Sequence, residues 1–169
     1  EEQTVVALTH FGYIKRMPID TYRSQKRGGK GITGISTREE DFVKQIFTAS
    51  THDTILFFSN KGKLYRLRGY EIPEAGRTAK GTAIVNLLRL DNGEKISAVI
   101  PITNFEDGKY LLMATKNGLI KKTALKDFDS TRKTGLLSIT LKDDDELIDV
   151  RLTDGEDNVV LVTSKGLSI

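Results

Sequence analysis

Residues 54–66 read TILFFSNKGKLYR, which is an apolar run, a short turn that contains a glycine, and a second strand-like run. Aliphatic, β-branched and aromatic residues on both sides of such a turn predict a β-hairpin. The pattern can be written as a strand, then Ser/Thr-x-x-Gly, then a second strand. It decides the fold because it recurs along the chain.

The same hairpin pattern occurs four times. The copies lie at residues 4–16, 54–66, 110–122 and 158–169. Their turn glycines are Gly12, Gly62, Gly118 and Gly166, at intervals of 50, 56 and 48 residues. In three copies a cation follows the glycine by four residues, at Arg16, Arg66 and Lys122, and the fourth copy ends before that position. Self-similarity at such a period indicates an array of repeated units.

Each of the first three hairpins is followed by a basic, glycine-containing loop. The loops end at Gly31, Gly81 and Gly135, which are 19, 19 and 17 residues after the turn glycines. Two more strand-like runs follow each loop, at 32–35 and 42–47, at 83–88 and 96–101, and at 136–141 and 147–152. Four strands in each repeat predict an all-β, propeller-like protein of four-stranded antiparallel blades. We expect one domain, with blades at about 1–50, 51–106 and 107–156 and part of a fourth at 157–169.

The first of these loops, residues 25–31, reads QKRGGKG, and Arg23 lies just upstream. Its composition suggests neither a strand nor a helix. One interpretation is an ordinary solvated loop, and the other is a binding site for a polyanion such as the phosphate backbone of a nucleic acid. A Walker-type phosphate loop is excluded, because Gly31 follows Lys30 where Ser or Thr is needed.

Positive charge recurs in the later loops, which favours the binding interpretation. Arg77 and Lys80 align with Arg27 and Lys30 in their distance from the turn glycine. The shorter third loop carries Arg132 and Lys133. Recurrence at one place in a repeat is not expected of a randomly basic loop.

Composition narrows the classes of protein further. The chain has 169 residues, a formal net charge of +3 and a pI near 9.0, which permits nucleic-acid binding without requiring it. It has no cysteine, so a disulfide scaffold and a cysteine metal site are excluded. No apolar run has membrane-spanning length, and no signal-peptide pattern opens the chain.

Other candidate residues are assigned to structure. His10 and His52 are expected at turns or on the surface, because no cluster with metal-ligand spacing surrounds them. The acidic run 143–146 is expected to be a solvated turn between strands, with cation binding as the alternative. Phe57, Phe58 and Tyr65 are expected in the core. The sequence defines no nucleophile–base set.

Residues 25–31 resemble, at all seven positions, the box Gln-Arg/Lys-Arg-Gly-Gly-Arg/Lys-Gly of the DNA gyrase A C-terminal domain. The box lies in the first repeat and imperfect copies follow, as in that family. The resemblance covers essentially the whole chain, as roughly the N-terminal half of the domain. It implies a β-pinwheel, a six-bladed propeller-like disc in which neighbouring blades exchange strands.

The resemblance also implies the function. In that family DNA bends around the basic rim of the disc and contacts the box, so that the holoenzyme introduces negative supercoils into DNA. By resemblance, Lys26, Arg27 and Lys30 contact phosphates, Gly28, Gly29 and Gly31 shape the loop, and Gln25 braces it. Arg23, just upstream, is also a DNA-binding candidate, and the line of phosphate contacts continues in the later loops at Arg77, Lys80, Arg132 and Lys133. The later copies depart from the box at Thr78 and Ala79 and at Thr131 and Thr134.

Partners and cofactors follow from the same resemblance. It implies duplex DNA, the rest of the gyrase A subunit, the gyrase B subunit, no membrane, and a cytoplasmic, nucleoid-associated location in a bacterium. It implies no cofactor in this domain, with ATP and Mg²⁺ used elsewhere in the holoenzyme and the DNA-cleaving tyrosine in another domain. Two alternatives stay open: the C-terminal domain of the topoisomerase IV A subunit, which usually lacks an intact box, and a propeller-type protein-interaction module.

Overall fold

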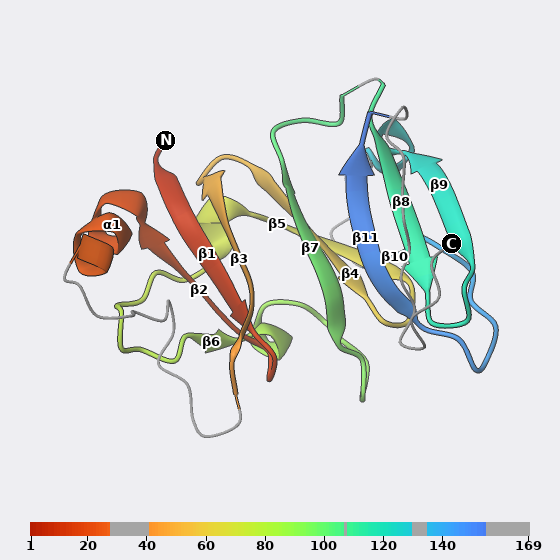
Figure 1. Cartoon of the computed structure of the whole chain (residues 1–169), viewed down its shortest axis with the longest axis horizontal. Coiled ribbons are helices and arrows are strands. Elements are labelled where there is room, and N and C mark those ends of the chain that lie inside the picture. The colour runs from red at the N-terminus through yellow and green to blue at the C-terminus, as the bar shows by residue number, and fades with distance from the viewer. Residues whose placement is uncertain (28–40, 107, 130–134, 155–169) are drawn as a thin grey trace.

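The computed structural model describes residues 1–27, 41–106, 108–129 and 135–154. Within these residues the chain forms three antiparallel β-sheets, one α-helix and three short 3₁₀ helices. Figure 1 shows the sheets following one another along the long axis, with α1 (Ile19–Arg27) at one end and β9 (Ile120–Ala124) at the other. None of the helices in the described part is long and apolar enough to cross a bilayer.

The strand order is the same in the first two sheets. Sheet A has the order β3 (Val43–Ser50), β1 (Gln3–Thr9), β2 (Tyr13–Pro18) and β6 (Thr82–Ala83). Sheet B has the order β7 (Ile96–Ile102), β4 (Thr54–Ser59), β5 (Lys63–Arg68) and β10 (Leu136–Leu137). Sheet C has β11 (Leu147–Thr153), β8 (Tyr110–Thr115) and β9 in the described residues. The all-β architecture and the hairpins β1–β2, β4–β5 and β8–β9 are confirmed.

The Ser/Thr-x-x-Gly turn has a common hydrogen-bonding scheme. The N–H of Gly12, Gly62 and Gly118 each donates to the carbonyl of the Ser or Thr three residues earlier, at 3.0 Å. The hydroxyl of that residue accepts the N–H of the residue after the glycine. The three glycines have φ between +80° and +91°, a conformation that favours glycine. The spacing of the motif is therefore set by local hydrogen bonding.

Each of the first two sheets takes its fourth strand from the next repeat. β6 pairs with β2 through Tyr13–Ala83 and Ile14–Thr82, and β10 pairs with β5 through Leu64–Leu136 and Lys63–Leu137. This confirms the exchange of strands between neighbouring blades that the family resemblance implies. Sheet C has three strands in the described part of the chain, because its fourth place is one that the following repeat fills in sheets A and B.

Two strand predictions are wrong in part. Residues 83–88 form only the end of β6 and then a 3₁₀ turn over Ile84–Asn86, and residues 136–141 form a strand only at 136–137. The apolar side chains of these segments cover a hairpin turn of the preceding repeat, and the segments do not continue the strand pairing. Ile84 N–H donates to the Gly12 carbonyl, and Ser138 N–H donates to the Gly62 carbonyl, both at 2.8 Å. Residues 32–35 and 158–169 lie outside the described residues.

The core lies between the sheets and consists of two clusters, and side chains of β4 pack into both of them. Phe57 packs with Val6, Leu8 and Ile14 of sheet A, whereas Phe58 packs with Leu111 and Met113 of sheet C. Both phenylalanines are completely buried, which confirms their prediction as core residues. A strand covered on both faces reads as a continuous apolar run, as residues 55–58 do.

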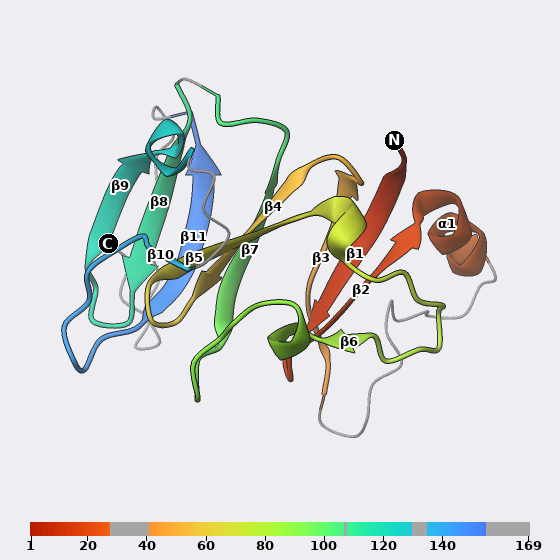
Figure 2. The same cartoon turned by 180° about the vertical axis from the view of Figure 1, so that it is seen from behind.

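The strands β3, β7 and β11 form the seam on one side of the array (Figures 1 and 2). Lys44 Nζ of β3 donates to the Ile96 carbonyl of β7 at 2.7 Å, and Ser97 Oγ of β7 donates to the Leu147 carbonyl of β11 at 2.7 Å. The exchanged strands join at the opposite edges of the sheets, β6 beside β2 in sheet A and β10 beside β5 in sheet B. These edges face away from the seam.

Candidate nucleic-acid interface

The first box begins on a helix. α1 runs from Ile19 to Arg27 and so includes Gln25, Lys26 and Arg27. The prediction that no helix would form in the box is therefore wrong for these three residues. Gln, Lys and Arg are good helix formers, and cations in the last turn interact favourably with the free carbonyl groups there. In the sequence the next two residues are Gly28 and Gly29, which lie outside the described residues.

The structure places only part of the first candidate site. Arg23 is exposed on α1. Gly28, Gly29, Lys30 and Gly31 lie outside the described residues, as do the side chains of residues 24–27. Since α1 starts directly after Pro18, the last residue of β2, the box is anchored to the same strand that receives the exchanged strand β6.

The second basic loop, residues 74–81, is laid along β2 of the first repeat. Arg16 N–H donates to the Pro73 carbonyl at 3.2 Å, and Ala75 N–H donates to the Arg16 carbonyl at 3.1 Å. At the other end, Gly81 approaches β2 so closely that an added Cβ would lie 2.6 Å from the Ile14 carbonyl oxygen. Gly81 also has φ +97°. Glycine is therefore favoured here both by the backbone conformation and by the lack of space for a side chain.

Lys15 holds the middle of the same loop. Its Nζ donates to the carbonyls of Gly76 at 2.6 Å, Arg77 at 3.0 Å and Ala79 at 3.0 Å. The side chain is 1% exposed. Burial lowers the pKa of Lys15 to about 8, while the three carbonyl oxygens favour the charged form. This contact between Lys15 and the loop is not predicted from the sequence. The signal for it is a lysine in a strand whose neighbouring residues Ile14 and Met17 are apolar.

The cations of the second loop differ in their surroundings. Arg77 is exposed at the bend of the loop. Lys80 is half-buried, and its Nζ lies over the Tyr13 ring at 4.1 Å from the centroid. The cation–π contact fixes the place of the ammonium group on the surface. Arg77 and Lys80 thus lie in a loop that is held against β2, and β2 leads directly into the helix that starts the first box.

In the third repeat, Arg132 and Lys133 lie outside the described residues. Gly135, which ends that loop, packs against Tyr65 of sheet B, where an added Cβ would be 2.9 Å from the ring. Tyr65 occupies the same place after its turn glycine as Lys15. The loop of the following repeat therefore meets this strand position in both sheets.

Tyr65 also closes a buried polar contact. Its hydroxyl donates to the carboxylate of Glu94, which is 5% exposed, at 2.9 Å to Oε1. Burial, followed by the hydrogen bond to Glu94, raises the pKa of Tyr65. Asp91 N–H donates to the same Glu94 oxygen at 2.8 Å, so Glu94 ties β5 to the turn before β7.

We expect Tyr65→Phe to lower the free energy of unfolding by about 2 kcal/mol, because it removes a hydrogen bond to a buried charged group. Tyr70→Phe is the matched control, since Tyr70 is 57% exposed, and we expect a change within about 0.5 kcal/mol. Urea unfolding followed by circular dichroism measures both. Equal losses in the two variants would contradict the assigned role of Tyr65.

The cation four residues after the turn glycine has a structural role that the sequence did not reveal. Arg16 Nε donates to the Ile72 carbonyl at 2.7 Å, and Arg66 Nη2 donates to the Phe128 carbonyl at 3.3 Å. Ile72 and Phe128 are both ten residues after their own turn glycines, Gly62 and Gly118. Each of these arginines thus holds the end of the hairpin that follows it in the array.

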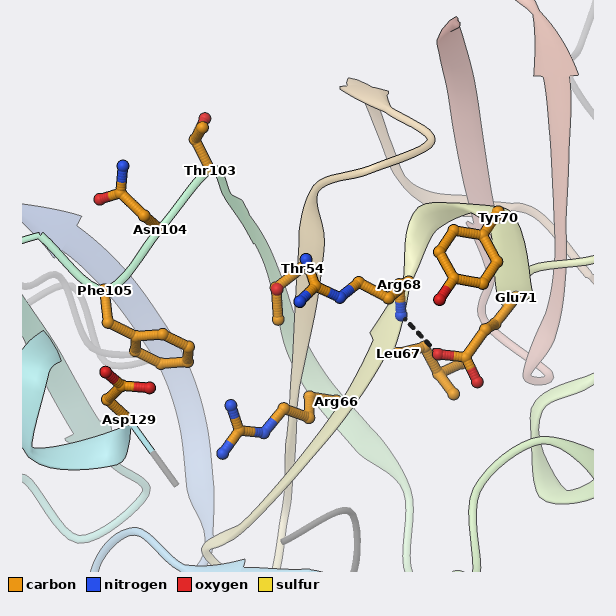
Figure 3. A pocket seen from close by; sticks show the side chains of 10 residues that line it. All are labelled: Thr54, Arg66, Leu67, Arg68, Tyr70, Glu71, Thr103, Asn104, Phe105 and Asp129. Carbon is orange, nitrogen blue, oxygen red and sulfur yellow. Dashed lines mark hydrogen bonds between the residues drawn. The ribbon is translucent and has the colours of Figure 1, made fainter. Parts of the chain in front are cut away.

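A cleft of about 500 Å³ lies beside Arg66 (Figure 3). Arg66 stacks on Phe105 at 5.1 Å, and burial lowers its pKa. The Arg68 guanidinium donates to the His52 carbonyl at 3.0 Å, and the Arg68 backbone N–H donates to the Glu71 carboxylate at 2.9 Å. Both guanidinium groups are therefore engaged by the protein itself, and the arrangement in Figure 3 contains no nucleophile paired with a base.

The remaining predictions can be compared directly. His10 and His52 are exposed in turns, as expected. Asp143, Asp144 and Glu146 are exposed between β10 and β11, which confirms the solvated turn. In the described part of the chain, no group of three or more His, Cys, Asp or Glu residues is arranged to hold a metal ion.

Comparison with known proteins gives a consistent result. A family model described as the DNA gyrase C-terminal domain, beta-propeller, matches residues 3–50, 53–103 and 109–154. The DNA gyrase A subunit of Clostridium acetobutylicum is 57% identical over 169 residues, which is 100% of this chain and 20% of that protein. The chain spans about a fifth of the length of the curated relatives that it matches.

Two solved structures share the fold. The crystal structure of the C-terminal domain of DNA topoisomerase IV has a TM-score of 0.78 and 34% identity, covering 91% of this chain and 46% of that one. The structure of the DNA gyrase A C-terminal domain has a TM-score of 0.64 and 28% identity, covering 90% of this chain and 48% of that one. The fold is common to both classes, whereas the family model and the sequence relatives favour gyrase.

Proposed function

Because this chain belongs to the DNA gyrase A C-terminal domain family, we propose that it binds duplex DNA through its basic loops without sequence preference. In the holoenzyme this binding wraps DNA so that negative supercoils can be introduced. The proposed partners are the remainder of the gyrase A subunit, together with the ATP-hydrolysing gyrase B subunit. The bacterial cytoplasm, at the nucleoid, is the proposed location.

One observation carries the proposal. The described parts of two successive basic segments are attached to one strand, β2: α1, which carries Arg23, continues from its last residue, and the loop with Arg77 and Lys80 is hydrogen-bonded along it. This strand lies on the side of sheet A away from the seam of β3, β7 and β11. A basic track of this kind matches a polyanion that passes from one repeat to the next.

The energetics suit wrapping. Bending a site of 20–30 base pairs costs on the order of 1–6 kcal/mol, which must be offset by phosphate contacts. Each neutralised phosphate contributes about −0.9 to the slope of log affinity against log salt. One loop with a few cations contributes too little, whereas loops repeated along an array suffice. Contacts to phosphates fix the position of DNA but do not read its sequence.

We expect steeply salt-dependent duplex binding by the chain, and we expect the triple variant Lys26/Arg27/Lys30→Ala to flatten the slope by about two or three units. Affinity is measured by fluorescence anisotropy across a salt series, with duplexes of two unrelated sequences. The matched control is Lys61/Lys116/Lys142→Ala, which removes the same charge from exposed lysines around the acidic run. We expect its slope to stay close to that of the parent.

Three outcomes would contradict the proposal. Weak binding that is insensitive to salt in the parent would exclude a phosphate-binding track. Equal flattening in both triple variants would mean that net charge, rather than the box, determines binding. A strong preference for one of the two duplex sequences would contradict binding through the backbone alone.

A further inference from the structure

Lys15 is a buried cation whose described contacts are backbone carbonyls rather than a carboxylate. It is the largest completely buried polar side chain of the described residues, and it lies on β2 between Ile14 and Arg16. Removing an ammonium group from water is costly unless it is well hydrogen-bonded. A methionine at this position would pack with the core at no such cost. The contacts that the ammonium makes must therefore explain its presence.

Those contacts fix the bend of the second basic loop. An ammonium group has three N–H donors, and all three are used by the carbonyls of Gly76, Arg77 and Ala79. Ala79 N–H in turn donates to the Gly76 carbonyl at 3.1 Å, which closes the bend. The peptide planes before and after Arg77 are thus oriented by one side chain from a residue 62 positions away.

The two ends of the loop are held separately. Ala75 N–H donates to the Arg16 carbonyl at one end, and Thr82 pairs with Ile14 at the other. Between these two fixed points lie six residues, and Lys15 is bonded to three of them. Without the ammonium group, the carbonyls of the exposed residues Gly76 and Arg77 can turn to water. The loop then stays attached but loses its defined bend.

We propose that Lys15 is a positioning residue for nucleic-acid binding, which holds residues 76–79 in the conformation that presents Arg77 to a DNA phosphate. The inference rests on the proposed function. Lys15 itself does not touch the DNA, because its side chain is enclosed by the loop that it organises. Its effect on binding is transmitted through Arg77.

The equivalent position in sheet B supports a positional role. Tyr65, also three residues after its turn glycine, contacts Gly135 at the end of the third loop. The loop of repeat n + 1 therefore rests on the same position of repeat n in both sheets. In the first sheet that position carries three donors and the loop has an exposed arginine at its bend.

The test compares the parent chain with Lys15→Met, Arg77→Ala and the double variant. Removing a phosphate contact lowers the salt slope by about one, so we expect Arg77→Ala to lose about one unit and Lys15→Met to lose nearly as much. We expect the double variant to lose no more than Arg77→Ala alone. Independent roles would instead give additive losses in this double-mutant cycle, and additivity would overturn the proposal.

Lys44→Met is the matched control. Lys44 also donates from its Nζ to a carbonyl of the next repeat, Ile96, but it lies on β3 and does not contact the loop. We expect its salt slope to remain that of the parent. A loss equal to that of Lys15→Met would show that any lysine between repeats has the same effect, and would overturn the proposal.

A second measurement follows the loop without DNA. Trypsin cleaves after Arg77 and Lys80, so the cleavage rate reports how firmly the loop is held. We expect faster cleavage at these two bonds in Lys15→Met and an unchanged rate in Lys44→Met. Unchanged cleavage in Lys15→Met would overturn the proposal. If Lys15→Met does not fold, Lys15→Gln replaces it, since the shorter side chain keeps a polar group but cannot reach all three carbonyls.

The outcomes separate this inference from the proposed function. Steep salt-dependent binding by the parent that Lys15→Met leaves unchanged would overturn only the role of Lys15. Absence of salt-dependent binding in the parent would overturn the proposed function and this inference together.

Discussion

Gly62→Ala is expected to lower the free energy of unfolding by about 3 kcal/mol, from left-handed backbone strain and from overpacking. Gly62 has φ +80°, and an added Cβ would lie 2.7 Å from the Ile139 carbonyl oxygen. The Gly62 carbonyl also accepts the N–H and the hydroxyl of Ser138 at 2.8 and 2.7 Å. The substitution therefore strains the turn and pushes away the segment that follows β10.

Gly118→Ala is the matched control for this effect. Gly118 has φ +91° in a turn with the same hydrogen bonds, but an added Cβ would meet nothing within 4 Å among the residues that the structure describes. We expect it to lose only the backbone part, about 1–2 kcal/mol. Urea unfolding followed by circular dichroism gives both values. Equal losses would show that the contact between repeats at Gly62 contributes nothing to stability.

The second large effect is a rise in stability with pH that depends on Lys15. Burial lowers the pKa of Lys15 from 10.5 to about 8. Between these two values the unfolded chain binds more protons than the folded one, so the free energy of unfolding increases as pH rises. The contribution is fully present above pH 10.5, is lost as pH falls through 8, and amounts to at most about 3 kcal/mol.

The charged groups near Lys15 do not reverse the direction of this pH dependence. The loop packed against it carries Glu74, Arg77 and Lys80, and β2 carries Arg16, so cations outnumber the one carboxylate. The desolvation of Lys15 and the hydrogen bonds to the three carbonyls act against each other, and the measured rise reports their balance.

Urea unfolding of the parent and of Lys15→Met from pH 7 to 10 tests this prediction. We expect the parent to gain stability relative to the variant above pH 8, because the variant has no group that titrates at this position. The other titrating groups are common to both proteins and cancel in the difference. Parallel pH profiles would mean that the three carbonyls hold the pKa of Lys15 near its ordinary value.

The sequence by itself determined the parts that depend on neighbouring residues. The hairpins with their turn glycines and the buried phenylalanines 57 and 58 follow from residues within a few positions of one another, and they were predicted. The period of the repeat also predicted an array of sheets. The family resemblance added the exchange of strands, which periodicity alone did not indicate.

The candidate site was predicted only in part. Arg77 and Lys80 are predicted by their distance from Gly62, and the structure shows that their loop lies against Lys15 and Tyr13 of β2. The composition of the box did not indicate the helix that carries Gln25 to Arg27, because three glycines in seven residues disfavour a helix, whereas Gln, Lys and Arg favour one. Lys15 was missed because its role depends on a loop more than 60 residues away.

Only the tertiary structure decided which repeat completes which sheet. Residues 83–88 and 136–141 have the composition of strands, yet each pairs for two residues and then turns to cover a hairpin of the preceding repeat. Their conformation is set by the Gly12 and Gly62 carbonyls and by the space beside them. Such long-range contacts outweigh local propensity, since burial and hydrogen bonding to a fixed partner contribute more than the small intrinsic preference of each residue for a strand.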